Sequence, residues 1–124
     1  MLKKKILVID DEKDFTDMVK LNLEMAGDFI VKAENKGTNG YSTAKKFKPD
    51  LILLDIMMPD MDGGDVLFKI NGDEELRKVP IVFLTALVKP GEDEGIDNRI
   101  SDRPALAKPI SAERLIAYVK DIIR

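Results

Sequence analysis

Cysteine, histidine and tryptophan are all absent from the 124 residues of this chain. Without cysteine the chain forms no disulfide, no thiolate metal site and no cysteine nucleophile. Without histidine it has no Ser-His-Asp triad, no histidine general base and no imidazole ligand. Any metal that its own side chains bind must be held by oxygen atoms, which favours magnesium, calcium or manganese.

The sequence also lacks long apolar runs and a strong excess of one charge. No apolar stretch approaches the roughly 20 residues that span a bilayer, and residues 6–9 are too few for the apolar part of a signal peptide. Twenty basic and 23 acidic residues give a net charge of −3, which argues against a dedicated nucleic-acid binder. We therefore expect a cytoplasmic protein with no membrane and no direct nucleic-acid contact, built as a single domain over residues 1–124.

Short apolar runs alternate with amphipathic segments along the chain. The runs, predicted as strands, are residues 6–9, 29–31, 51–54, 81–84 and 105–107. The segments with a helical apolar period are residues 14–26, 38–47, 65–70 and 112–123. Several runs lack polar alternation, which is typical of parallel strands covered on both faces. The pattern predicts an α/β fold: a flavodoxin-like, doubly wound, five-stranded parallel sheet in the order 2-1-3-4-5, with helices on both faces.

The segment from Lys89 to Arg103 departs from this alternation. It holds eight charged residues, two glycines and a proline, and its large apolar residues are Ile96 and Ile100. The segment predicts either a short, weakly anchored helix or a mobile loop.

Polar residues follow the predicted strands. Asp10 and Asp11 follow the first, and Asp55 follows the third. Thr85 ends the fourth, and Lys108 follows the fifth. Because the carboxyl ends of parallel strands open onto one edge of the sheet, where such sheets bind ligands, we expect these five side chains to converge.

Three carboxylates at close range repel one another, and a divalent cation removes the repulsion. Magnesium prefers about six oxygen ligands and is usually held by one or two carboxylates together with phosphate oxygens. We expect Asp11 and Asp55 to bind it, with Asp10 either as a further ligand or in contact with a ligand.

A carboxylate can also attack an activated phosphoryl donor to form an acyl phosphate. Lys108 and Thr85 would then serve as cation and hydroxyl donor to the phosphoryl oxygens.

At these residues the sequence resembles the receiver domains of bacterial two-component response regulators. The segments that carry the resemblance are Ile6–Glu12, Asp50–Pro59 with Gly63 eight residues past Asp55, Pro80–Ala86 and Lys108–Pro109. They occur in the order of the family and cover essentially the whole chain. The resemblance implies that Asp55 is the phosphoacceptor, that Asp10 and Asp11 bind Mg2+ with Asp55, and that the backbone carbonyl of Met57 joins them.

The resemblance also implies that Thr85 and Lys108 are switch residues that respond to the phosphoryl group, and that Lys108–Pro109 is a cis peptide. The chain departs from the family at Ala105, where an aromatic residue usually stands three positions before the switch lysine. Alanine has no side chain for the inward rotation that is the usual output step, and the whole of residues 88–107 is atypical. The resemblance thus supports the phosphorylation site more strongly than the usual readout.

We interpret the sequence as a stand-alone receiver that accepts a phosphoryl group from a histidine kinase or phosphotransfer protein and is read by an unidentified downstream protein. It is not expected to be an enzyme, beyond assisting its own phosphorylation and dephosphorylation. Two alternatives stay open: a degenerate receiver used as a docking module, and a small aspartyl-phosphate phosphatase or phosphotransferase. The second needs a group that positions water, and the flanking Met57 and Leu87 are apolar. A flavodoxin-like cofactor binder is disfavoured, because the acidic residues 10–12 would repel a phosphate without a metal.

Overall fold

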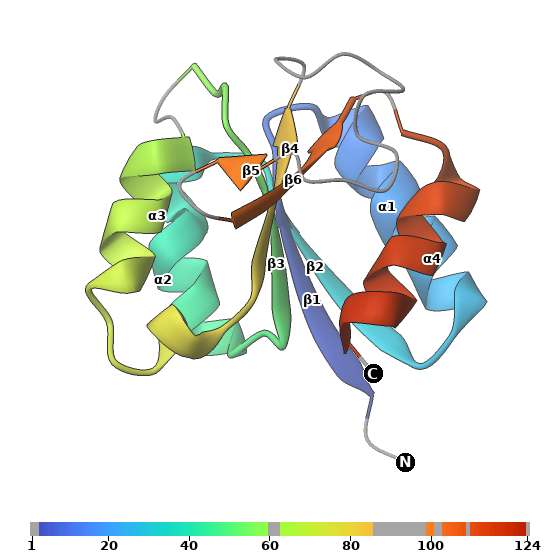
Figure 1. The fold of residues 1–124 in the computed structure, drawn as a ribbon, viewed down its shortest axis with the longest axis horizontal. Helices are drawn as coiled ribbons and strands as arrows, with labels where there is room; N and C mark the ends of the chain where they lie inside the picture. The colour runs from blue at the N-terminus through green and yellow to red at the C-terminus, as the bar shows by residue number, and fades with distance from the viewer. Residues whose placement is uncertain (1–2, 60–62, 86–98, 101–102, 109, 124) are drawn as a thin grey trace.

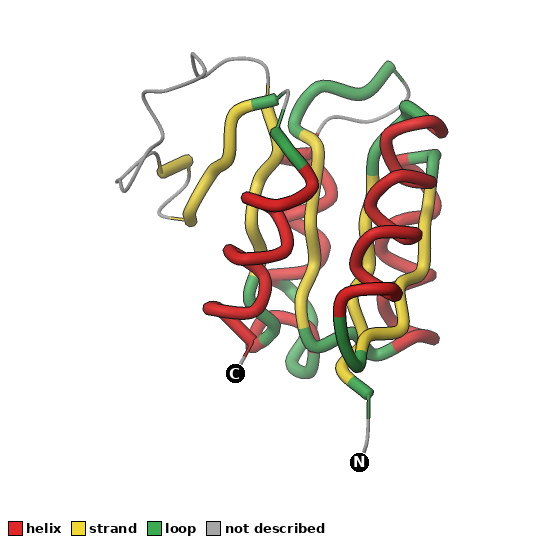
Figure 2. Tube along the Cα trace, turned by 90° about the vertical axis from the view of Figure 1, so that its right-hand side faces the viewer, coloured by secondary structure: helices red, strands yellow, loops and turns green. Residues whose placement is uncertain are grey.

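The computed structural model describes residues 3–59, 63–85, 99–100, 103–108 and 110–123. A central sheet is covered by helices on both faces (Figures 1 and 2). The strands are β1 (Lys4–Ile9), β2 (Phe29–Glu34), β3 (Leu51–Asp55), β4 (Ile81–Thr85), β5 (Arg99–Ile100) and β6 (Arg103–Ala107). The helices are α1 (Lys13–Ala26), α2 (Gly37–Phe47), α3 (Gly63–Asn71), the 3-10 helix η1 (Leu76–Lys78) and α4 (Ala112–Ile123). None of the helices within these described ranges is long and apolar enough to cross a bilayer.

The strand order is β2-β1-β3-β4-β6-β5. The first five of these pair in parallel, so β6 is the predicted fifth strand and the predicted order 2-1-3-4-5 is confirmed. The two-residue strand β5 was not predicted, since a helix or a loop was expected there. It pairs antiparallel with β6 and covers the outer edge of that strand, whose backbone groups would otherwise lack a neighbouring strand. The expectation for residues 89–98 and 101–102 lies outside the described residues.

The apolar runs are buried because both of their faces are covered. In β1, Ile6 and Val8 pack toward α1 and α4, whereas Leu7 and Ile9 pack toward α2 and α3. The strands β3 and β4 are buried along their whole length. This double burial explains the absence of polar alternation in the sequence and fixes the carboxyl ends of the strands relative to one another.

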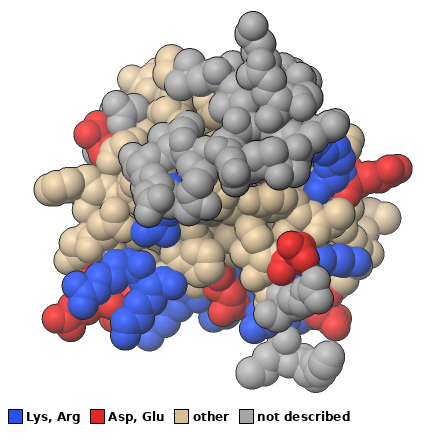
Figure 3. Space-filling model, in the orientation of Figure 1, with Lys and Arg blue, Asp and Glu red and all other residues tan. Residues whose placement is uncertain are grey.

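The helix ends follow from local chemistry. Ser111 precedes α4, and its Oγ accepts a hydrogen bond of 3.2 Å from the backbone N–H of Arg114. After α3 the chain turns at Asp73. The Asp73 carboxylate accepts hydrogen bonds from the backbone N–H groups of Glu75 and Leu76, which leads into η1. On the face drawn in Figure 3, Lys and Arg side chains gather around η1, at the end of the sheet where the strands begin. The acidic residues discussed next lie at the opposite end.

Candidate functional site

The candidate site lies where four parallel strands end. Asp10 follows β1, Asp55 is the last residue of β3 and Thr85 is the last residue of β4. Lys108 follows β6, and its backbone N–H donates a hydrogen bond of 2.9 Å to the carbonyl of Thr85. The expected convergence at one edge of the sheet is therefore observed, and it also includes the exposed Asp11.

Asp10, Asp11 and Asp55 form a compact acidic cluster. One carboxylate oxygen from each lies within 4.8 Å of the others. Asp10 is fully buried and Asp55 is 4% exposed, whereas Asp11 is exposed. Two buried carboxylates and an exposed one thus offer only oxygen ligands, as Mg2+ prefers.

Burial and repulsion make the proton affinity of this cluster unusual. Burial and, to a smaller extent, the nearby charge of Asp10 together raise the pKa of Asp55 to about 7. Burial also raises the pKa of Asp10, although a hydrogen bond from Lys108 and one from the backbone N–H of Glu12 work in the opposite direction. Ionising either carboxylate is therefore unfavourable in the folded protein, and an added positive charge would make it less so.

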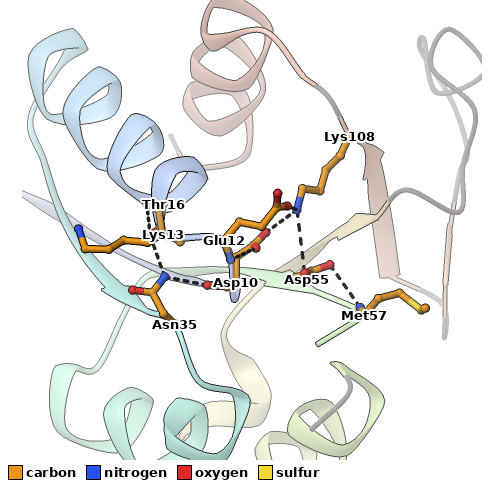
Figure 4. Close-up of polar contacts among 8 residues, drawn as sticks. All are labelled: Asp10, Glu12, Lys13, Thr16, Asn35, Asp55, Met57 and Lys108. Atoms are coloured by element: carbon orange, nitrogen blue, oxygen red, sulfur yellow. Dashed lines mark hydrogen bonds and ion pairs between the residues drawn. The ribbon is translucent and has the colours of Figure 1, made fainter. Parts of the chain in front are cut away.

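Lys108 supplies one positive charge inside the site (Figure 4). Its Nζ lies 2.8 Å from Asp10 Oδ2, 2.6 Å from Glu12 Oε1 and 3.9 Å from Asp55 Oδ2. It also lies 4.6 Å from the centroid of the Phe15 ring, within reach of a cation–π interaction. Burial tends to lower the pKa of Lys108, but the hydrogen bonds to Asp10 and Glu12 outweigh it and raise that pKa. Lys108 is thus a firmly charged ammonium.

A second polar network fixes the backbone of Asp10, and sequence reasoning missed it. Asn35 Nδ2, just after β2, donates to the carbonyl oxygen of Asp10 at 2.8 Å and to Thr16 Oγ1 at 2.9 Å (Figure 4). Thr16 is fully buried in α1, and its hydroxyl donates in turn to the carbonyl of Lys13. The available signal was an asparagine directly after a strand that ends at this same edge.

The turn after β3 shapes the surroundings of Asp55. The backbone N–H of Met57 donates to Asp55 Oδ1 at 3.3 Å, and Met57 is 61% exposed. Gly63 donates its backbone N–H to the carbonyl of Ile56 at 2.7 Å. A Cβ on Gly63 would lie 2.6 Å from the carbonyl oxygen of Asp55 and 2.8 Å from the Cα of Ile56. Only glycine fits this close approach of two backbones.

Two residues named in the sequence analysis lie outside the described residues: Pro109, which the expected cis peptide involves, and the flanking apolar Leu87. Ala105 is 4% exposed and belongs to β6, where it pairs with Phe83. The position at which the family usually has an aromatic residue is therefore part of the packed core in this chain.

Comparison with known proteins agrees with this geometry. The family model described as the response regulator receiver domain matches residues 6–120. The chain belongs to this family. The receiver domain is 37% identical over 121 residues to the DNA-binding dual master transcriptional regulator RpaA of Synechocystis sp., covering 97% of this chain but 49% of RpaA. It thus spans about half the length of RpaA and of several other curated relatives that it matches.

Two further relatives are similar to this receiver domain over nearly their whole length. Protein PilH of Pseudomonas aeruginosa is 33% identical over 122 residues, which cover 96% of this chain and 97% of PilH. The solved structure of the chemotaxis protein CheY4 of Vibrio cholerae superposes with a TM-score of 0.80 at 25% identity, covering 97% and 98% of the two chains. Receiver domains of this family are signalling switches that interact with histidine kinases and downstream effectors and bind Mg2+ at an acidic pocket.

Proposed function

We propose that this receiver domain is a phosphorylation-dependent switch in which Asp55 accepts a phosphoryl group from the phosphohistidine of a histidine kinase or phosphotransfer protein. The observation that carries the proposal is the position of Asp55: it is nearly buried, it lies beside two further aspartates, and an ammonium group stands 3.9 Å away. A nucleophilic carboxylate next to both a cation site and a fixed positive charge is suited to phosphoryl transfer.

The donor set fits Mg2+. Asp10, Asp11 and Asp55 offer carboxylate oxygens within 4.8 Å of one another, and the backbone carbonyl of Met57 would complete the protein ligands. The raised pKa of Asp55 fits the same assignment, since burial and the charge of Asp10 leave this cluster short of positive charge. When bound, the ion would supply positive charge to the carboxylates and to the phosphoryl oxygens.

In the proposed transfer, an oxygen of the Asp55 carboxylate attacks the phosphorus atom. The new O–P bond forms as the P–N bond to the donor histidine breaks, and the electron pair of that bond stays on the imidazole nitrogen, which takes up a proton from solvent. Lys108 neutralises negative charge on the phosphoryl oxygens, and Thr85 ends the adjacent strand as a hydroxyl donor. The phosphorylated surface is then read by a downstream protein, whose identity the site does not specify.

The test is the intact mass of the protein after incubation with Mg2+ and a small acyl phosphate donor. We expect a gain of one phosphoryl group in the wild type and none in Asp55→Asn. Asp14→Asn is the matched control, because it removes an exposed carboxylate from the first turn of α1 without touching the cluster. An unmodified wild type, or an Asp55→Asn protein that still gains the group, would contradict the proposal.

A further inference from the structure

Glu12 is an acidic residue of the site that the proposed function leaves without a role. Its Oε1 lies 2.6 Å from Lys108 Nζ, closer than the carboxylate of Asp55 at 3.9 Å. The side chain of Glu12 is 62% exposed, whereas that of Lys108 is only 14% exposed. A partly solvated carboxylate therefore holds one side of an ammonium group that is otherwise enclosed (Figure 4).

The backbone holds Glu12 firmly in this position. Its N–H donates to Asp10 Oδ1 at 2.9 Å, and its carbonyl accepts the backbone N–H groups of Phe15 and Thr16 as α1 begins. The ring of Phe15, one turn further along, lies 4.6 Å from Lys108 Nζ. The first turn of α1 thus contacts the lysine with both a carboxylate and an aromatic face.

The resting partners of Lys108 hold its ammonium nitrogen away from Asp55. An ammonium group has three N–H donors, and two of them are engaged by Asp10 and Glu12. At 3.9 Å the oxygen of Asp55 lies beyond hydrogen-bonding distance. A phosphoryl group on Asp55 would attract the ammonium strongly, because it carries a charge of about −1.5 to −2, more than a single carboxylate.

The two resting partners of Lys108 differ in how easily they can release it. Asp10 is fully buried, so losing the ammonium would leave a buried negative charge without its neighbouring cation. Glu12 is mostly exposed, so water can replace the ammonium at its carboxylate with little loss of free energy. Glu12 is therefore the partner that yields more readily when the ammonium moves toward Asp55, which lies 3.9 Å away in the resting protein.

We propose that Glu12 is a positioning residue that competes with the phosphoryl group on Asp55 for Lys108. In the resting protein Glu12 keeps the ammonium next to α1. The phosphorylated state is therefore less stable than it would be without Glu12. This inference rests on the proposed function of Asp55 as the phosphoacceptor.

The test compares two affinities in Glu12→Gln. The first is the affinity for beryllofluoride, a mimic of a phosphoryl group on a carboxylate, at saturating Mg2+. Because an ion pair with one mostly exposed partner contributes only modestly, we expect beryllofluoride to bind about threefold more tightly than in the wild type. The second is the affinity for Mg2+ alone, which should stay equal or fall, because the substitution removes a negative charge near a cation site. A merely structural role of Glu12 would weaken both.

Asp14→Asn is the matched control for the general effect of losing one negative charge, since it removes one exposed charge from the same helical turn. It should leave the affinity for beryllofluoride at the wild-type value. If Glu12→Gln binds beryllofluoride no more tightly than the wild type, or if Asp14→Asn gains as much, the competition is overturned while the proposed function stands. If wild-type protein saturated with Mg2+ binds no beryllofluoride, the proposed function falls and this inference with it.

Discussion

The ammonium nitrogen of Lys108 lies 2.8 Å from the carboxylate of Asp10 but 3.9 Å from that of Asp55. Among the described residues, Lys108 therefore lies beside a cluster of three aspartates and is hydrogen-bonded to Asp10, the most deeply buried of them. The cluster keeps an excess of negative charge in the ligand-free protein. This excess is the physical basis for the expectations about metal binding and pH that follow.

Mg2+ should stabilise the folded protein. Binding to the native state alone raises the free energy of unfolding by RT ln(1 + [L]/Kd), roughly 1.4 kcal/mol at a tenfold excess over Kd. The melting temperature of chelator-treated protein should therefore rise when Mg2+ is added. Asp11→Asn should abolish the rise, whereas Asp14→Asn should keep it. If the melting temperature of the wild type does not change when Mg2+ is added, the proposed cation site is contradicted.

The pH dependence of stability should carry the signature of Asp55. Its folded-state pKa is raised to about 7 by burial and then by the charge of Asp10, well above the ordinary value of 3.8. The folded state thus binds the proton more tightly, so the stabilising contribution is fully present below the ordinary pKa and is lost as pH rises through about 7. In metal-free protein, Asp55→Asn should remove this decline between pH 4 and 7.

The measurement is chemical denaturation of the wild type and Asp55→Asn across that pH range, in chelator. Other carboxylates titrate in both proteins, so the difference between the two curves isolates Asp55. We expect the variant to gain stability relative to the wild type as pH rises. Parallel curves would show that folding does not raise the pKa of Asp55.

Much of this site could be predicted from sequence because it depends on strand ends. The apolar runs of β1, β3 and β4 are buried on both faces, so their lengths alone determine where Asp10, Asp55 and Thr85 must emerge. Contacts made by helices were harder to foresee. Whether Phe15 faces Lys108 depends on the rotation of α1 against the sheet, and apolar periodicity gives that rotation only coarsely.

Two other features escaped prediction for related reasons. The bonds from Asn35 to Asp10 and Thr16 join the residue after β2 to the residue after β1 and to helix α1, and one asparagine carries no periodic signal. The strand β5 has only two residues, too few for any alternation to be recognised. Its pairing is set by the position of β6, which is a tertiary property.

Gly63 should be intolerant of even the smallest side chain. A Cβ there would lie 2.6 Å from the carbonyl oxygen of Asp55, and a backbone atom cannot move aside as a flexible side chain can. We expect Gly63→Ala to destabilise the protein by about 1–3 kcal/mol, as overpacking commonly does. Because the clash falls on Asp55 itself, phosphorylation by a small acyl phosphate donor should also slow.

Gly72→Ala is the control for that experiment. A Cβ at Gly72 would meet the carbonyl oxygens of Lys69 and Phe68 at 3.6 Å, an ordinary contact distance. Denaturation curves and initial phosphorylation rates of the two variants can be compared directly. Equal behaviour of Gly63→Ala and Gly72→Ala would mean that the turn after β3 relaxes without disturbing Asp55.

The lifetime of the phosphorylated state should depend on Met57. This residue stands two positions beyond Asp55, its N–H donates to Asp55 Oδ1 and it is 61% exposed. Hydrolysis of an acyl phosphate needs a water molecule aligned opposite the leaving carboxylate, and a thioether is only a weak hydrogen-bond acceptor for that water. The flexible apolar side chain can instead shield the phosphoryl group. We therefore expect slow loss of the phosphoryl group from the wild type.

Replacing Met57 with asparagine would give the water a hydrogen-bonding partner and reduce the apolar cover. The decay of phosphorylated Met57→Asn, followed by intact mass after removal of the donor, should be about threefold faster or more, equivalent to a lowering of the barrier by about 0.7 kcal/mol. Met57→Leu keeps an apolar side chain of similar size and should decay at the wild-type rate. A rate in Met57→Asn equal to that in Met57→Leu would mean that access of water to Asp55 is controlled elsewhere in the site.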